Sequence, residues 1–112
     1  RKARLDRACA EAGRDPQTLA FSVMTSCFVG WHRAEAVERV RRFVARRGDA
    51  IDAAALLEER SDRWIAGSVE EAAARLDELR GLGVDRIFLQ HLSHDDDEML
   101  ALVGERLLPA LR

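Results

Sequence analysis

The fold is decided by the stretch WIAGSVEEAAARLDELRGLGVDRIFLQ, which spans residues 64–90. Its first residues, 64–67, predict a tight turn, and Ser68 is a good N-cap for the helix that follows. Glu71 completes a capping box with Ser68, because its side chain can return to the N-cap backbone. Apolar residues then recur at helical spacing and glycines end the helix: Val69, Ala72, Ala73, Leu76 and Leu79, then Gly81 and Gly83.

The helix leads into a short segment that is apolar on both faces. Ile87 and Leu89 lie on one side of the predicted strand, and Phe88 lies on the other. A strand of this kind is typical of a sheet that is covered on both faces. A capped helix that runs into such a strand is one α-to-β passage of an α/β protein.

The rest of the chain predicts more elements of the same kind. We expect strands over residues 19–29 and 85–92, and helices over 1–12, 33–47, 51–63, 69–82 and from 93 to the end. Alternation of this kind favours a parallel sheet with right-handed crossovers. A sheet of two parallel strands, with mostly helical surroundings, leaves an unpaired edge on each strand. The chain is therefore expected to be one part of a longer protein.

Composition excludes several functional classes. With 112 residues the chain is at most one domain, and its net charge of −2 gives no general attraction to nucleic acid or to an anionic membrane. No apolar run is long enough to cross a bilayer. Cys9 and Cys27 are expected to be buried free thiols, which suits a reducing, cytoplasmic setting.

Three segments, taken in order, resemble the C-terminal end of the luciferase-like monooxygenase superfamily. Residues 12–16 form a turn before a strand, and residues 64–71 are similar to the family's I-x-G-T-P-E-E run. Residues 83–90 are followed by a final helix that ends at residues 107–111. Ser68 and Val69 stand where the family more commonly has Thr and Pro, but Ser caps a helix as well as Thr does.

The resemblance implies a fold, a cofactor and an incomplete domain. The family has a (β/α)₈ barrel and uses FMN or its deazaflavin analogue, so residues 1–112 would be the C-terminal part of such a barrel. Residues 19–29 and 85–92 would be the last two barrel strands, with a helical insertion over about 31–63. The parent would be a flavin-dependent oxidoreductase or monooxygenase acting on a small organic substrate. Because a barrel needs roughly 250 residues, the chain alone is expected to be inactive and to form homo-oligomers.

Four residues are candidate cofactor contacts under this resemblance. Gly67 and Ser68 begin a helix at the functional face of the implied barrel, where exposed N–H groups favour a phosphate. Gln90 and His91 end the last strand and could contact the flavin or the substrate. The alternatives stay open: Gly67-Ser68 as a helix cap alone, and Gln90 or His91 as polar residues of a strand end. The sequence names no catalytic residue.

Other polar groups point less clearly to a site. His91 and His94 with Asp95, Asp96 and Asp97 could suggest a metal site, but the aspartates fit better in the first turn of a helix. The arginines of residues 33–47 are interleaved with glutamates, which predicts a solvated helix face, although Arg33 or Arg63 could touch a cofactor phosphate. Trp31 and Trp64 are interpreted as packing residues.

A second interpretation needs no catalysis. The chain could be a small helix-rich interaction module that folds as it stands and self-associates through the wide apolar face of its last helix. The two interpretations differ in what lies upstream. Further strand–helix repeats in the same reading frame favour the barrel, and a start codon just before Arg1 favours the module.

Overall fold

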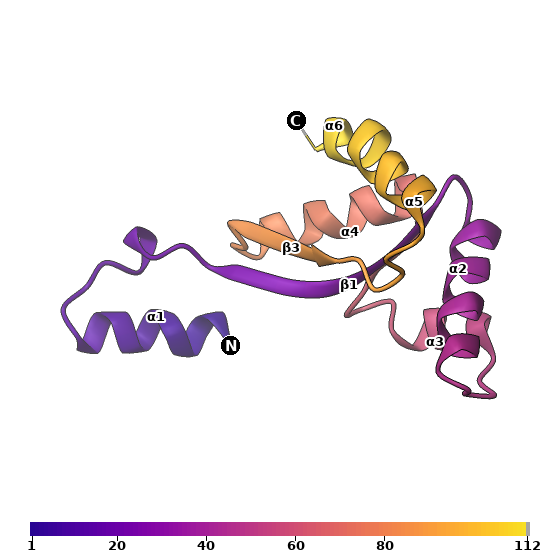
Figure 1. The fold of residues 1–112 in the computed structure, drawn as a ribbon. Coiled ribbons are helices and arrows are strands. Elements are labelled where there is room, and N and C mark those ends of the chain that lie inside the picture. Colours follow the sequence, from indigo (N-terminus) through magenta and orange to yellow (C-terminus); the bar gives the residue numbers. More distant parts are fainter. Residues whose placement is uncertain (112) are drawn as a thin grey trace.

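The structure is a computed structural model that describes residues 1–111, and it has a parallel three-stranded sheet with helices (Figure 1). The strands are β1 (Ser22–Gly30), β2 (Ile65–Ser68) and β3 (Arg86–Gln90). The helices are α1 (Lys2–Glu11), α2 (Arg33–Arg46), α3 (Ala53–Glu59), α4 (Val69–Gly81), α5 (Asp97–Leu102) and α6 (Leu108–Ala110). A 3₁₀ turn, η1, covers Pro16–Thr18, and a π-helical segment, η2 (Val103–Leu107), joins α5 to α6.

The strand order is β2-β1-β3, and both pairings are parallel. The first half of β1 pairs with β3, so that Ser26 lies opposite Gln90. The second half of β1 pairs with β2, so that Gly30 lies opposite Ser68. The prediction that the two long strands are parallel neighbours in an α/β fold is therefore confirmed.

The predicted strand count was too low, because residues 64–67 are not simply a turn. Residues 65–68 form β2, a third strand. A four-residue strand that contains a glycine has the same local signal as a turn, and its extended conformation depends on its pairing with β1. Gly67 has a φ of +115°, which a residue with a side chain rarely adopts.

Two apolar clusters hold the sheet. On one face, Cys27, Val29 and Ile65 pack against Leu76 of α4 and Leu107 of η2. On the other face, Phe28 is buried with residues of α2 and α3, including Val40 and Leu57. Phe28 also contacts the rings of Phe43 and Trp64, with centroid separations of 5.3 and 5.0 Å. The second half of β1 is therefore covered on both faces.

The first half of β1 and all of β3 are covered on one face. Ile87 and Leu89 pack toward the cluster under α4, and Figure 1 shows α4, α5 and α6 on that side of the two strands. On the opposite face, Met24 is 66% exposed and Phe88 is 48% exposed. α1 stands apart from the sheet in Figure 1, although Lys2 reaches the ring of Phe21. This face of the sheet, where Met24 and Phe88 stand among polar residues, therefore lacks a covering layer in the described chain.

The helix limits agree with expectation in part. The capping box of α4 is present as predicted, with Ser68 accepting from the N–H of Glu71 at 3.1 Å. The helix expected over 51–63 is shorter, since Asp52 caps it and it ends at Glu59. The last helix begins at Asp97 rather than residue 93, because Asp96 is its N-cap. Cys9 and Cys27 are buried free cysteines, as predicted. Among residues 1–111, no helix has the length and apolar character needed to cross a membrane.

Candidate cofactor-binding edge of the sheet

The carboxyl end of β1 is closed tightly by the start of α2. A Cβ atom on Gly30 would lie 2.7 Å from the backbone nitrogen of Ala36 and 2.7 Å from the Cβ of Glu35. Only glycine therefore lets α2 pack directly on the strand end. His32 caps this helix, and its Nδ1 accepts from the N–H of Glu35 at 3.3 Å.

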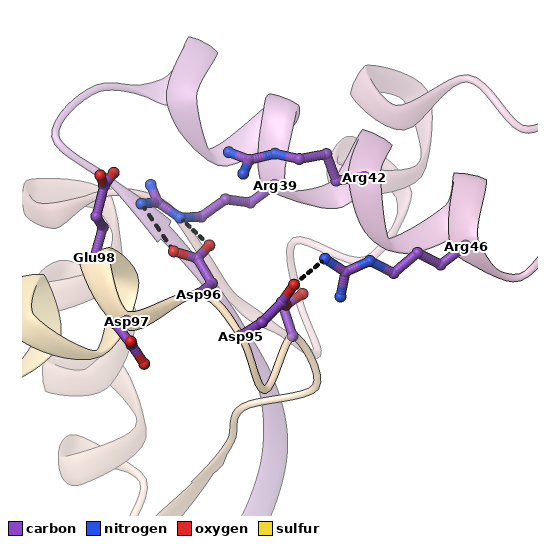
Figure 2. A pocket seen from close by; sticks show the side chains of 8 residues that line it. Arg39, Arg42, Arg46, Asp95, Asp96, Asp97 and Glu98 are labelled. Atoms are coloured by element: carbon purple, nitrogen blue, oxygen red, sulfur yellow. Dashed lines mark hydrogen bonds and ion pairs between the residues drawn. The ribbon is translucent and has the colours of Figure 1, made fainter.

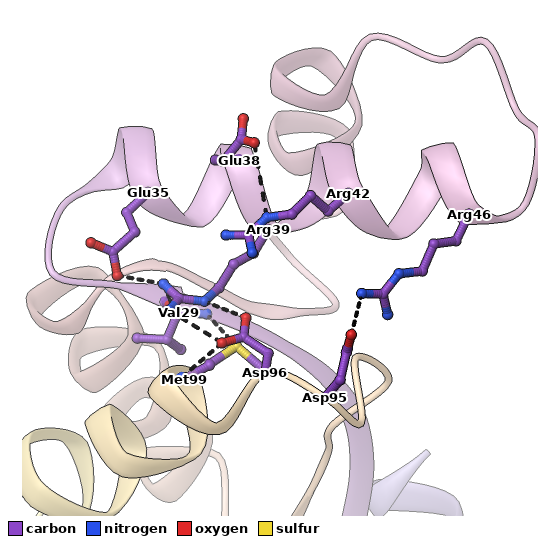
Figure 3. Close-up of polar contacts among 9 residues, drawn as sticks. All are labelled: Val29, Glu35, Glu38, Arg39, Arg42, Arg46, Asp95, Asp96 and Met99. Atoms are coloured by element: carbon purple, nitrogen blue, oxygen red, sulfur yellow. Dashed lines mark hydrogen bonds and ion pairs between the residues drawn. The ribbon is translucent and has the colours of Figure 1, made fainter.

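A buried arginine ties this end of β1 to the segment that follows β3 (Figure 3). Arg39 of α2 is 2% exposed and donates from Nε to Asp96 at 2.7 Å. Its Nη1 donates to the carbonyl of Val29 at 3.2 Å and also to Glu35. Asp96 in turn accepts from the N–H of Met99 at 3.1 Å and so begins α5. We call Arg39, Glu35, Asp96 and the Val29 carbonyl the Arg39 cluster.

The electrostatics of the Arg39 cluster keep its groups charged. Burial on its own lowers the pKa of Arg39, but the hydrogen bonds to Asp96 and Glu35 outweigh it, and the pKa is raised. Burial likewise opposes ionisation of Asp96, but Arg39 and the Met99 N–H bring its pKa below the ordinary value. For Glu35, the hydrogen bond from Arg39 is the main cause of a lowered pKa. All three groups are thus ionised at neutral pH and hold one another in place.

A pocket of ≈ 350 Å³ lies beside this cluster (Figure 2). Arg39, Arg42 and Arg46 line it from α2, and four carboxylates line it from the opposite side: Asp95, Asp96, Asp97 and Glu98. Arg46 donates to Asp95 at 2.7 Å. Because acidic side chains outnumber the arginines and already engage two of them, an anion entering here would compete with carboxylates. The ion pairs that line the pocket therefore act mainly to join α2 to the start of α5.

Gly67 and Ser68 lie at the same edge of the sheet, but a carboxylate already occupies the helix start. Glu71 accepts from the N–H of Ser68 at 3.3 Å, and Ser68 Oγ accepts from the N–H of Glu71. Arg33 neutralises this carboxylate at 2.5 Å and also contacts Glu58 at 2.6 Å. The capping box therefore consumes two of the donors that a phosphate would use.

Gln90 and His91 lie at the end of β3. Gln90 is exposed and follows Phe88 on the uncovered face of the sheet. His91 is half-buried, and its Nδ1 atom is buried without a hydrogen-bond partner in the described residues. A ring nitrogen can accept or donate a hydrogen bond, so Nδ1 of His91 is an unsatisfied polar atom within the described residues.

The structure does not bring the four predicted residues into one cluster. Ser68 lies level with Gly30 and Gln90 lies level with Ser26, on opposite sides of β1. Four residues along a strand correspond to about 13 Å. The two halves of the predicted site could therefore contact different ends of one extended ligand, but not the same group.

A metal site has no support in residues 1–111. These residues contain no group of three or more His, Cys, Asp or Glu side chains with ligand geometry. His94 is exposed, Asp95 pairs with Arg46, and Asp96 caps α5. The interpretation of the aspartates as helix-start residues is therefore confirmed for Asp96 and Asp97.

Sequence reasoning missed Arg39, which it grouped with a solvated arginine face. That interpretation holds for Arg41 and Arg42, which are exposed, but Arg39 is buried. The signal was in the spacing, because position 39 lies on the same helical face as Ala36 and Val40. The packing interpretation is confirmed for Trp64, which contacts Phe28, whereas Trp31 is exposed with Arg106 4.9 Å from its ring centre.

Comparison with known proteins identifies the fold through solved structures. No protein-family model and no characterised protein sequence matches this chain. A coenzyme F420 dependent tetrahydromethanopterin reductase from Methanopyrus kandleri superposes with a TM-score of 0.70 at 17% identity. The match covers 99% of this chain and 41% of that chain.

A second solved structure agrees with the first. The monooxygenase RslO1 from Streptomyces bottropensis superposes with a TM-score of 0.69 at 19% identity, over 99% of this chain and 37% of that one. The chain thus spans about two fifths of the proteins that it matches. At this level of identity the likeness is one of fold alone, and it agrees with the prediction that the chain has the fold of one part of a larger α/β protein.

Proposed function

We propose that this chain is the C-terminal part of a flavin- or deazaflavin-dependent oxidoreductase of the luciferase-like superfamily. The observation that carries the proposal is the coverage: nearly the whole chain superposes on a reductase and a monooxygenase, yet on less than half of each. The parallel pairing of β1 with β3 supports it, because neighbouring barrel strands are parallel and have helices between them in the chain, as α2, α3 and α4 are here.

Within this proposal, the carboxyl ends of the strands face the cofactor. Gln90 and His91 contact the flavin ring or the substrate, and the unpartnered Nδ1 of His91 supports that role. Gly67 and Ser68 lie at the phosphate end, which requires Glu71 to leave the Ser68 N–H. When bound, the cofactor carries the electrons, and the protein supplies orientation and a dry surrounding.

The chain by itself has no activity in this proposal. The sheet face that carries Met24 and Phe88 would form part of the barrel interior, and the rest of the barrel wall would have to come from further strands. Exposed apolar surface and unpaired strand edges favour association, so the isolated chain forms homo-oligomers. Light scattering that finds a monomer at high concentration would contradict this part of the proposal.

The proposal is tested by the reading frame and by flavin binding. We expect the natural gene to encode further strand–helix repeats upstream, and the longer protein to bind FMN or F420 stoichiometrically. The 112-residue chain serves as the matched control, since it should leave flavin fluorescence unchanged. A start codon directly before Arg1, or tight flavin binding by the isolated chain, would overturn the proposal.

The exposed Met24 and Phe88 side chains also support the second interpretation, a self-associating module without catalysis. Met24 and Phe88 could be covered by another copy as well as by further strands. Both proposals expect oligomers of the isolated chain, so oligomeric state does not separate them. Flavin binding by the natural full-length product does separate them, because the module would bind none.

A further inference from the structure

Trp31 is a large aromatic side chain that neither apolar cluster of the core contains. It directly follows Gly30 at the carboxyl end of β1, and it is 55% exposed. The close packing of α2 on Gly30 fixes the backbone on which Trp31 stands. The ring already meets a cation, because the guanidinium of Arg106 lies 4.9 Å from its centre. The face of an exposed indole ring attracts positive charge, so Trp31 is a candidate contact for a charged ligand.

A groove of ≈ 260 Å³ lies beside Trp31, between the start of α2 and the helix that α5 and η2 form. We call it the Trp31 groove. Its apolar surface includes Trp31 and Leu102, and its charged lining residues are Glu35, Arg39, Glu98 and Glu105. Pockets that hold drug-sized ligands measure roughly 300–1,000 Å³. The Trp31 groove therefore fits a smaller occupant.

The charge of the Trp31 groove is negative. Arg39 is neutralised by its own ion pairs with Glu35 and Asp96. Glu98 and Glu105 are exposed, and neither forms an ion pair within residues 1–111. Two carboxylates without a counter-charge, placed beside the face of an aromatic ring, favour a cation that also has an apolar surface.

We propose that the Trp31 groove binds a small alkylated ammonium ion. The positive charge of the ligand lies over the Trp31 ring, with Glu98 and Glu105 beside it, and its alkyl groups meet Leu102. Arg106 is then an internal occupant of the ring that the ligand displaces, since both are cations. The inference does not rest on the flavin proposal, because none of these residues is a candidate cofactor contact.

The first experiment titrates the natural full-length gene product with choline. The protein is labelled with fluorotryptophan, and the fluorine NMR resonance of Trp31 is assigned by its loss in Trp31→Phe. We expect a saturable shift of this resonance. The matched control ligand is dimethylbutanol, the uncharged carbon analogue of choline, which should bind at least about tenfold more weakly. Potassium chloride at the same concentration should leave the resonance in place.

Variants measured by calorimetry test the role of each group. Glu98→Gln with Glu105→Gln should weaken choline binding about fivefold. The matched control is Glu59→Gln with Glu70→Gln, which removes the same charge at exposed positions outside the groove and should leave binding unchanged. Arg106→Gln should tighten binding about two- to fivefold, because it removes the internal competitor for the ring. A purely structural role of Arg106 would not produce tighter binding.

Several results would overturn the inference. Equal binding of choline and dimethylbutanol would show that the groove does not select charge, and an equal shift with potassium chloride would indicate a general salt effect. A resonance that choline does not move, or that only a lysine-rich peptide moves, would exclude a small ligand. Unchanged or weaker binding by Arg106→Gln would contradict the position of the charge over Trp31. If a variant does not fold, the comparison of the two ligands on the unaltered protein still decides the question.

Discussion

The two halves of β1 each pair with one strand, but they differ in burial and in what contacts the edge away from that strand. The carboxyl half, residues 27–30, is buried, pairs with β2 and is held by the Arg39 cluster. The amino half, residues 22–26, pairs with β3 on one side only and leaves Met24 66% exposed. Residues of this chain cover the carboxyl half of the strand on both faces, whereas one face of the amino half stays exposed. The carboxyl half of β1 ends at the edge where parallel sheets bind their ligands.

The largest effect on stability is expected at the carboxyl half of β1. Arg39→Ala removes the partner of Asp96, which is 10% exposed, and leaves a buried carboxylate without its counter-charge. We expect a loss of about 3–5 kcal/mol in the free energy of unfolding, as for other broken buried ion pairs. Urea denaturation measures this loss. Arg41→Ala is the matched control on an exposed face and should change stability by less than about 0.5 kcal/mol.

The same cluster should make stability depend on pH. Asp96 and Glu35 have pKa values lowered in the folded state from 3.8 and 4.5, so the unfolded state binds protons first as the pH falls. Their contribution is therefore complete above about pH 5 and is lost as the pH falls through the folded-state values. Urea midpoints between about pH 7 and about pH 3 measure this loss. The Arg39→Ala variant should show a flatter profile, and an equally steep one would contradict the assignment.

A smaller loss is expected from the glycine that ends β1. Gly30→Ala places a methyl group 2.7 Å from the backbone nitrogen of Ala36, so α2 must shift away from the strand. We expect a cost of about 1–3 kcal/mol, typical of overpacking, measured by thermal or urea unfolding. Gly104→Ala is the control, because a Cβ there meets nothing within 4 Å. Equal stability of the two variants would argue against close packing of α2 on Gly30.

The smallest effect on stability is expected at the amino half of β1. Met24→Ser with Phe88→Ser changes two side chains on the uncovered sheet face, so stability should shift by less than about 0.5 kcal/mol. The same change should reduce self-association of the isolated chain, since it removes exposed apolar surface. Sedimentation measures the second effect. A large loss of stability would mean that this face is covered within the chain.

Elements with a complete local signal were predictable from the sequence. α4 has a capping box at Ser68 and Glu71, an apolar face and a glycine-rich end, and it forms over nearly the expected residues. β3 is short, but it stands between a helix end and a loop, so its position was clear. These elements depend on residues a few positions apart, so a short sequence pattern is enough to predict them.

Elements that depend on distant partners were not predictable in the same way. β2 is four residues long and is extended because it pairs with β1, more than thirty residues earlier in the chain. The candidate site shows the same limit. Sequence reasoning placed Ser68 at a helix start and Gln90 at a strand end, but it could not place them on opposite sides of β1.

The sequence by itself determined the α/β class, the parallel pairing of the two long strands and the capped helix between them, because periodicity, caps and glycines act locally. Only the tertiary structure decided that Arg39 is buried against Asp96 and Val29, and that residues 22–26 have β3 as their one strand partner within residues 1–111. The physical reason is that burial and ion pairing depend on residues that are close in space, even when they are distant along the chain. Asp96 is 57 positions from Arg39 along the chain, and no pattern within a single helix or strand relates the two.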